Sequence, residues 1–349
     1  MKERNYGVDL LRLVLMFMVC ILHTLGQGGI LDACKAGAFN YKVYWFIEIL
    51  SYCAVDGFAI ISGYMATDKP RKYEKIVEMW FQAFFYSFVL TLIFTVIGIN
   101  KSWDKADIIK CIFPVVHGKF WYFTAFFALF FATPILNRFL FGIDEDTAKK
   151  ALILFFVLFS VGGVIADPFK TELGYSAIWL IVLYCIGVLA KRVKLFEKRK
   201  SITLLLLWAC CILFTWGKHV FGATDKYTNY VSPSILLCGM IMVVLFSRLK
   251  LKGTVISKLS PLAFGIYLFQ LNQVVWNILI KNAFTFVIAK RTRFGVIYVF
   301  ALSALIFVAG LTVEFIRSKI AAWIRIPAIS KKIVKLIDKC LQKLFIFLK

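Results

Sequence analysis

Charged residues are scarce in this chain of 349 residues, at 17% of the total. A soluble globular domain carries about 25% charged residues. Hydrophobic residues make up 61% of the chain, with 36 Phe and 9 Trp, which is more apolar surface than a single aqueous core absorbs. The composition therefore excludes an ordinary soluble domain and favours a chain that is solvated by lipid.

Histidine is rare as well, with 3 in the chain, and the 9 cysteines show no C-x-x-C spacing. The phosphate-binding motif G-x-x-x-x-G-K-[ST], the hydrolase motif G-x-S-x-G and the zinc motif H-E-x-x-H are all missing. We therefore expect no metal site, no NTP hydrolysis and no permanently bound cofactor. We also expect the thiols to be free rather than paired.

Positive charge is plentiful, because 42 Lys and Arg outnumber 19 Asp and Glu and give a formal net charge of +23. The basic residues lie between apolar runs, as in the cytoplasmic loops of membrane proteins, and not on one polar domain that would bind nucleic acid. The N-terminus resembles a signal peptide, but Asp9 and Arg12 interrupt its apolar stretch and no A-x-A site follows that stretch directly. We interpret residues 8–25 as a retained first span.

Ten apolar runs approach the length of about 20 residues that a membrane-spanning helix needs. Lys and Arg are about twice as abundant in one set of alternate loops as in the other, and the basic loop 191–200 is the strongest single signal. The sequence thus predicts an all-α, polytopic transmembrane bundle of about ten spans with both termini in the cytoplasm. The predicted spans are 8–25, 43–65, 79–98, 120–141, 150–166, 175–190, 201–217, 233–249, 261–280 and 295–316.

A short basic segment follows the last span, so we divide the chain into a transmembrane domain, 1–327, and a C-terminal helix, 328–349. In the C-terminal segment, apolar residues recur at helical spacing between lysines. This pattern is typical of an amphipathic helix that lies on the anionic inner leaflet and binds membrane lipids. The lysines at every fourth position are Lys331, Lys335, Lys339 and Lys343.

An ionisable residue within a span is costly and is by default a candidate for function. The first span contains Asp9, Arg12 and His23. Asp9 precedes Arg12 by one turn, and His23 follows Arg12 by three turns, about 16 Å farther along the axis. The three side chains therefore share one face. For Asp9 and Arg12 alone, an interfacial ion pair is an equally good interpretation, but the histidine on the same face favours a functional site.

The second span contains Asp56, a carboxylate that must meet a cation or several hydrogen-bond donors. Near it, Gly57, Ser62 and Gly63 permit close helix approach. In the last span, Glu314 and Arg317 have the spacing of an interfacial ion pair.

Two further clusters admit two interpretations each. Trp121 and Tyr122 open a span, where they would form either an aromatic belt or a platform for sugar stacking. The ninth span carries four hydrogen-bonding side chains that would either join helices or line a polar cavity. These four are Tyr267, Gln270, Asn272 and Gln273.

In this order and spacing, the clusters resemble acyltransferase family three, integral-membrane O-acyltransferases that acylate bacterial surface polysaccharides, peptidoglycan and other glycans. Arg12 and His23 match the family's pattern of Arg, ten residues, then His, preceded by its Asp in GVDLLR. The segment DGFAIISGY, which begins at Asp56, is similar to D-x-F-F-x-x-S-G-Y. FWYFTAFFALFFATPILN resembles the aromatic start of a middle helix, and LAFGIYLFQ the late segment G-x-Y-L-x-H.

The chain departs from the family at two places. Many members have an R-x-x-R pair after the second span, where this chain has DKPRKYEKIVEMW with Arg71 and Lys72. A lysine keeps the attraction for phosphate but loses the bidentate geometry. The late histidine of the family is replaced by Gln270.

The resemblance implies transfer of an acyl group, usually acetyl, from cytoplasmic acyl-CoA to a hydroxyl of a cell-surface or lipid-linked glycan at the bacterial cytoplasmic membrane. It implies that His23 is general base or transient acyl carrier, with Asp9 or Asp56 orienting its ring. The expected donor-binding residues are Arg12, Arg71 and Lys72, and the expected acceptor-binding residues are Ser62, Trp121, Tyr122, Tyr267, Gln270 and Asn272.

Two other functions remain open at this point. A transporter or flippase for a glycan, a lipid-linked sugar or an amino acid would also combine ten spans with a few buried charges. The replacement at Gln270 is also compatible with a membrane anchor or sensor whose site is vestigial.

The predicted topology can be tested with reporter tags. Tags at residue 1, within loop 191–200 and at residue 349 should report the cytoplasm, because the basic loops are retained there. A tag near residue 225 should report the opposite side. A cytoplasmic signal from residue 225 would contradict the loop assignment.

Overall fold

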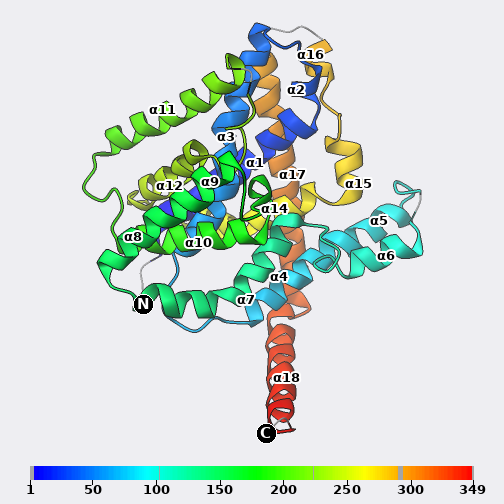
Figure 1. Cartoon of the computed structure of the whole chain (residues 1–349). Coiled ribbons are helices and arrows are strands. Elements are labelled where there is room, and N and C mark those ends of the chain that lie inside the picture. Colours follow the sequence, from blue (N-terminus) through cyan, green and yellow to red (C-terminus); the bar gives the residue numbers. More distant parts are fainter. Residues whose placement is uncertain (1–3, 102, 223, 290–293, 348–349) are drawn as a thin grey trace.

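The computed structural model describes residues 4–101, 103–222, 224–289 and 294–347. Within these ranges the chain is helical and forms no strand, which confirms the predicted class (Figure 1). The α-helices are α1 Tyr6–Leu22, α2 Ile30–Ala33, α3 Phe39–Tyr64, α4 Glu74–Phe84, α5 Leu90–Val96, α6 Lys105–Ile112, α7 Trp121–Gly142, α8 Glu145–Phe155, α9 Gly162–Ile165, α10 Ala177–Arg192, α11 Ser201–Val220, α12 Pro233–Ser247, α13 Thr254–Leu259, α14 Ala263–Gln270, α15 Gln273–Val275, α16 Phe286–Ala289, α17 Gly295–Trp323 and α18 Ile326–Phe347.

Several spans combine an α-helix with a π-helical turn, in which the backbone hydrogen bond reaches one residue farther than in an α-helix. Such turns extend α1, join α4 to α5 and α8 to α9, and follow α15. They are His23–Gln27, Phe85–Val89, Phe156–Val161 and Trp276–Ile280.

Seven helices in the described residues are long and apolar enough to cross a membrane. An eighth span results if Thr254–Gln270 and Gln273–Ile280, which meet at a bend of 64°, form one broken span. Each of the ten predicted ranges coincides with helical structure, but α10 and α12 are shorter than the other spans. The protein is thus a multi-pass membrane protein, and the count of ten and the orientation stay predictions. The seven helices are Tyr6–Gln27, Phe39–Tyr64, Glu74–Val96, Trp121–Gly142, Glu145–Ile165, Ser201–Val220 and Gly295–Trp323.

The helices divide into buried and peripheral elements. The cores of α1, α3, α10 and α12 are buried by protein, whereas α11 and α17 expose large apolar side chains such as Leu206 and Leu305. Lipid solvates such exposed side chains without cost, so the peripheral helices need no further protein cover. The described cysteines, which include all nine, are free, as expected.

Glycine brings α3 and α10 into close contact at the centre of the bundle. A Cβ atom added at Gly63 would overlap the carbonyl oxygen of Tyr184, and one added at Gly187 would overlap the carbonyl oxygen of Ile60. The two backbones therefore touch directly, as small residues allow in membrane interiors. This contact fixes the position of α3, which carries one wall of the cavity described below.

Polar side chains satisfy backbone groups where helices begin. Asn5 accepts a hydrogen bond from the N–H of Val8 at 3.0 Å and starts α1. Asp144 accepts hydrogen bonds from the hydroxyl and the N–H of Thr147, and these bonds lower the pKa of Asp144 to about 2. The charged cap thus fixes the start of α8, where helix N–H groups favour an anion.

The predicted ion pair of Glu314 and Arg317 forms in α17, with Arg317 Nη2 2.7 Å from Glu314 Oε1. It is buried rather than interfacial, because Glu314 is only 1% exposed, lies against Gly265 and accepts a hydrogen bond from Tyr86 at 2.9 Å. The pair therefore joins α17 to α14 and to the π-helical turn that contains Tyr86.

The predicted C-terminal helix is present as α18, Ile326–Phe347, and projects from the bundle beyond the end of α17 (Figure 1). It contacts α4 and α17. Its position on the lipid surface stays a prediction.

We predict that Gly187→Ala lowers the stability of the bundle by about 1–3 kcal/mol, because the added methyl group must push α3 away from α10. Thermal unfolding of the purified protein in detergent measures this change. Gly217→Ala in α11 is the matched control, since nothing lies within 4 Å of its Cβ position. Equal melting temperatures for the two variants would contradict the close contact.

Candidate functional site in a cavity along the first helix

A cavity of about 610 Å³ runs along one face of α1. It is closed on the other sides by α3, α7 and α14, and by loop residues between the spans. Eight residues of α1 and its π-helical turn line it, at the helical spacing of one face, and the predicted Asp9, Arg12 and His23 are among them. They are Asp9, Arg12, Met16, Val19, Leu22, His23, Gly26 and Gln27.

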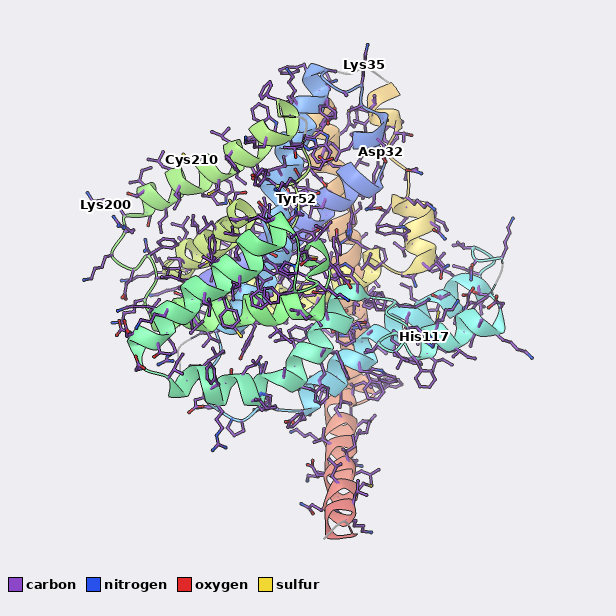
Figure 2. The ribbon with its side chains drawn as sticks, in the orientation of Figure 1. Asp32, Lys35, Tyr52, His117, Lys200 and Cys210 are labelled. Carbon is purple, nitrogen blue, oxygen red and sulfur yellow. The ribbon has the colours of Figure 1, made fainter. Side chains whose placement is uncertain are left out.

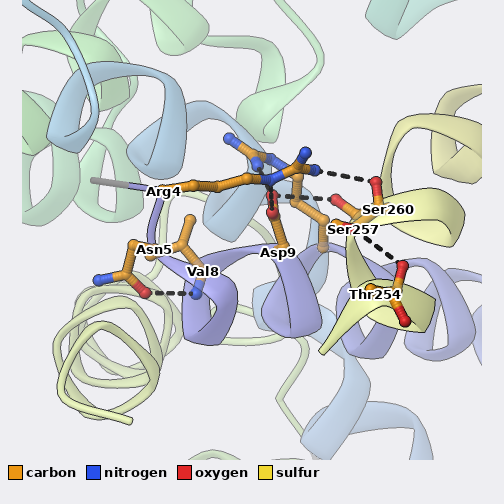
Figure 3. Close-up of polar contacts among 8 residues, drawn as sticks. Arg4, Asn5, Val8, Asp9, Thr254, Ser257 and Ser260 are labelled. Atoms are coloured by element: carbon orange, nitrogen blue, oxygen red, sulfur yellow. Dashed lines mark hydrogen bonds and ion pairs between the residues drawn. The ribbon is translucent and has the colours of Figure 1, made fainter. Parts of the chain in front are cut away.

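Asp9 holds two guanidinium groups at one end of the cavity. Its Oδ1 lies 2.6 Å from Nη1 of Arg12, and its Oδ2 lies 2.5 Å from Nε of Arg4. Ser260 donates a further hydrogen bond to Asp9 at 3.2 Å, and Arg4 also donates to the carbonyl of Ser257 (Figure 3). The predicted pair of Asp9 and Arg12 is confirmed, and the carboxylate orients both arginines with donors left for an anion.

Arg4 is a site residue that the sequence interpretation missed. It lies before the first span and reads as an ordinary basic residue of the N-terminus. Only the fold shows that its guanidinium turns back to share Asp9 with Arg12.

His23 lies at the start of the π-helical turn that follows α1, and its Nδ1 is 2.9 Å from Oε1 of Gln270. The amide of Gln270 has a defined direction, because its Nε2 donates to the carbonyl of Ile266 at 3.2 Å, and a carbonyl can only accept. Oε1 therefore faces the ring, and Nδ1 of His23 must be the protonated nitrogen. This tautomer leaves the lone pair of Nε2 available as a base or nucleophile.

The indole of Trp276 packs edge-on against the His23 ring, with 5.4 Å between ring centroids. Together with Gln270, it holds the imidazole in one orientation at the wall of the cavity. Gln270, predicted to bind the acceptor, is buried outside the cavity lining and is hydrogen-bonded to His23. The carboxylates Asp9 and Asp56, predicted to orient the His23 ring, have other partners.

The helix break after Gln270 explains how this amide reaches His23. Asn272 caps the break: its Oδ1 accepts from the N–H groups of Val274 and Val275, and its Nδ2 donates to Tyr86 and Thr91. Asn272 thus satisfies backbone groups at membrane depth, where unpaired polar groups are costly. Its predicted role in acceptor binding is not supported, since it is 1% exposed and bonded on both sides of its amide.

Asp56 lies outside the cavity lining and is fully buried in α3. Its Oδ1 accepts a hydrogen bond from the indole of Trp179 at 3.0 Å. Asp56 thus joins α3 to α10, next to the close glycine contact, and the structure does not bring this predicted catalytic residue to the cavity.

Arg71 is likewise not at the cavity. Its guanidinium donates to the hydroxyls of Thr133 at 3.0 Å and Tyr184 at 3.4 Å, and lies over the ring of Phe130. These contacts connect the loop after α3 to α7 and α10, whereas Arg4 lines the cavity beside Arg12. Lys72 is exposed beside Arg71, and its role stays a prediction.

The other predicted acceptor-binding residues do line the cavity, namely Ser62, Trp121, Tyr122 and Tyr267. The hydroxyl of Tyr267 accepts from the N–H of Tyr122 at 3.1 Å at the start of α7, so its oxygen is engaged. The hydroxyl of Tyr122 itself is buried without a hydrogen-bond partner among the described residues. Trp121 packs on Tyr175, another lining residue, with 4.8 Å between ring centroids.

Glu48 in α3 is a lining residue that the sequence interpretation overlooked. It is 6% exposed, and its Oε2 has no hydrogen-bond partner among the described residues. The signal was available, because a carboxylate within the predicted span 43–65 meets the same criterion that selected Asp56.

The other histidines lie away from the cavity. His117 is exposed near α6 (Figure 2). It therefore lies far from Tyr52, a lining residue that Figure 2 shows within the bundle. His219 belongs to α11 and is thus a second helical imidazole, with Nδ1 2.7 Å from Asp225 and Nε2 3.1 Å from the hydroxyl of Tyr41. Neither ring reaches the cavity lining, so His23 alone supplies an imidazole there.

The fold and site define a multi-pass membrane protein with an oriented histidine and two arginines in one internal cavity. The family model described as an acyltransferase domain matches residues 5–314. The chain therefore belongs to acyltransferase family 3 and is a membrane acyltransferase. The family assignment favours this activity over the transporter alternative. No curated protein and no solved structure matches the chain.

We predict that Asp9→Asn lowers the melting temperature, because it leaves the partly exposed Arg12 guanidinium without its counter-charge; the cost should lie below the about 3–5 kcal/mol of a fully buried pair, since solvent screens Arg12. In a double-mutant cycle, Asp9→Asn combined with Arg12→Gln should be less destabilising than the sum of the single changes. Glu145→Gln, which removes the exposed pair with Lys149, is the control and should change little. Additive effects at Asp9 and Arg12 would contradict the coupling.

Proposed function

We propose that this membrane acyltransferase moves an acyl group, usually acetyl, from acyl-CoA to a hydroxyl of a cell-surface or lipid-linked glycan at the bacterial cytoplasmic membrane. The observation that carries the proposal is the oriented imidazole of His23 in a cavity that has two guanidinium groups at its other end. The family assignment supports the acyl-transfer chemistry.

Arg4 and Arg12 bind the phosphates of the donor. Both guanidinium groups line the cavity, and Asp9 uses only part of their donor capacity. Guanidinium groups suit phosphate because their planar forks bind two oxygens at once. Arg12 precedes His23 by about 16 Å along the helix axis, a span that the extended pantetheine arm of the donor bridges, so the thioester reaches His23 while the phosphates stay at the entrance.

His23 acts as general base toward the acceptor. Its Nε2 takes the proton of the acceptor hydroxyl as that oxygen forms a bond to the acyl carbon of the thioester. The carbon–sulfur bond then breaks, and the imidazolium returns the proton to the departing thiolate. The products are the ester of the acceptor and free CoA. Gln270 keeps Nδ1 protonated and the ring aligned throughout, as the third member of a triad does.

The acceptor occupies the part of the cavity near His23, where aromatic rings predominate. Trp121, Tyr122 and Tyr175 present ring faces on which a sugar stacks, and the unpaired hydroxyl of Tyr122 provides a hydrogen bond. Ser62 lines the same cavity but lies farther along α3, toward the arginines, since Gly57 of α3 lies against Leu15 of α1.

We predict that His23→Ala reduces acyl transfer by a factor of about 10²–10⁴ at saturating donor, because the general base is lost. Arg12→Ala should instead weaken acyl-CoA affinity, and Arg12→Lys should be milder because it retains the charge but loses the fork. Release of CoA thiol from acetyl-CoA by the purified protein measures both effects. Glu145→Gln serves as the control and should leave both parameters unchanged.

Gln270→Ala distinguishes orientation of the His23 ring from binding of the donor. This variant should lower the rate of transfer without changing the affinity for acetyl-CoA. Full activity of a folded His23→Ala protein would refute the mechanism. A protein that neither binds nor consumes acetyl-CoA would refute the proposed donor.

A further inference from the structure

Glu48 occupies an unusual position for a carboxylate. It lies in a membrane-spanning helix, is 6% exposed and forms no hydrogen bond or ion pair within the part of the chain that the structure describes. A Cβ atom added at Gly26 would lie 3.4 Å from its Oε1, which places the carboxylate against the π-helical turn that begins at His23. An unpaired buried carboxylate of this kind is costly, so a ligand group is the natural partner.

Aromatic rings continue from Glu48 along the cavity wall. Tyr52 follows Glu48 by one helical turn on the same face of α3. The ring of Tyr52 lies 5.5 Å from that of Tyr230, and Tyr230 lies 5.1 Å from Tyr175, which in turn packs on Trp121. All of these side chains line the cavity, so its wall combines one carboxylate with several π faces.

The charges of the cavity are separated along its length. The cations Arg4 and Arg12 lie at the end that Asp9 and Ser260 occupy, whereas Glu48 lies beside the turn of His23. Among the lining residues no lysine or arginine is paired with Glu48. One end of the cavity is therefore suited to an anion, and the other end to a cation.

We propose that Glu48 and the aromatic wall of Tyr52, Tyr230, Tyr175 and Trp121 bind an ammonium group of the acceptor, which makes the acceptor an amino sugar or a glycan that carries one. A carboxylate next to aromatic faces is the combination that recognises organic cations, through an ion pair and cation–π attraction. This inference rests on the proposed function and names the substrate class of the same site.

In this arrangement Glu48 selects and positions the acceptor and takes no part in proton transfer. The ammonium group anchors one side of the sugar near the turn of His23, and a neighbouring hydroxyl then meets Nε2 of the imidazole. A neutral sugar would leave the carboxylate unpaired and would bind less well for that reason.

The test compares glucosamine, protonated at mildly acidic pH, with glucose, which has a hydroxyl in place of the ammonium group. Isothermal titration calorimetry on the purified full-length protein should show glucosamine binding about tenfold or more tighter than glucose. Glu48→Gln keeps the shape and removes the charge, so it should abolish most of this preference. Its affinity for acetyl-CoA should stay unchanged, because Arg4 and Arg12 are intact.

Three further variants sharpen the comparison. Glu172→Gln removes an exposed acid outside the cavity lining and should keep the preference. Tyr52→Phe keeps the ring face and should also keep it, whereas Tyr52→Leu should reduce it. The wild-type comparison needs no variant, so it decides the question even if Glu48→Gln fails to fold.

Equal affinities of the wild type for glucosamine and glucose would overturn the proposal, as would a preference that survives in folded Glu48→Gln. Failure of the proposed function would look different. The preference for glucosamine would then be present, but the protein would release no thiol from acetyl-CoA.

Discussion

A polar group inside a bilayer must find its partner within the protein, and this constraint governs the helix break after Gln270. An interrupted helix frees N–H and C=O groups that lipid cannot satisfy. The side chain of Asn272 satisfies these groups. It accepts hydrogen bonds from two backbone N–H groups of α15, and it donates to Tyr86 in the π-helical turn before α5 and to Thr91 in α5. The break can therefore persist at membrane depth, and it places the last residue of α14 beside His23. The geometry of the contact between His23 and Gln270 thus depends on a structural amide two residues away.

The cavity brings together charged and polar groups from distant parts of the sequence, and their partners determine the charge at each end of the cavity. Asp9 lies between two partly exposed arginines and offsets part of their mutual repulsion, while donors remain for an anionic ligand. Gln270, an uncharged partner, orients the imidazole without adding a negative charge beside it. The carboxylate of Glu48 lines the cavity without a hydrogen bond or a counter-charge among the described residues. A cavity with such an arrangement can accept a polyanionic donor and a different acceptor from separate ends.

The sequence predicted the helical class, helical structure within each of the ten predicted ranges and the shared face of Asp9, Arg12 and His23, because apolar length and the 3.6-residue period are local properties. It could not show that Asp56, Arg71 and Asn272 join helices outside the cavity lining, because a buried polar residue that joins helices has the same local pattern as one that binds a ligand. The partner of each side chain decides between the two roles, and partners such as Trp179 and Thr133 come from distant segments.

The π-helical turn at His23–Gln27 has a consequence for how relatives of this chain can vary. Such a turn contains one residue more than the α-helical turn that it replaces, so it changes the rotation of the backbone that follows it. The turn begins at His23, and the interval from Arg12 to Leu22 is entirely α-helical. A change of length in the loop that follows therefore need not rotate His23 away from the helix face that carries Arg12.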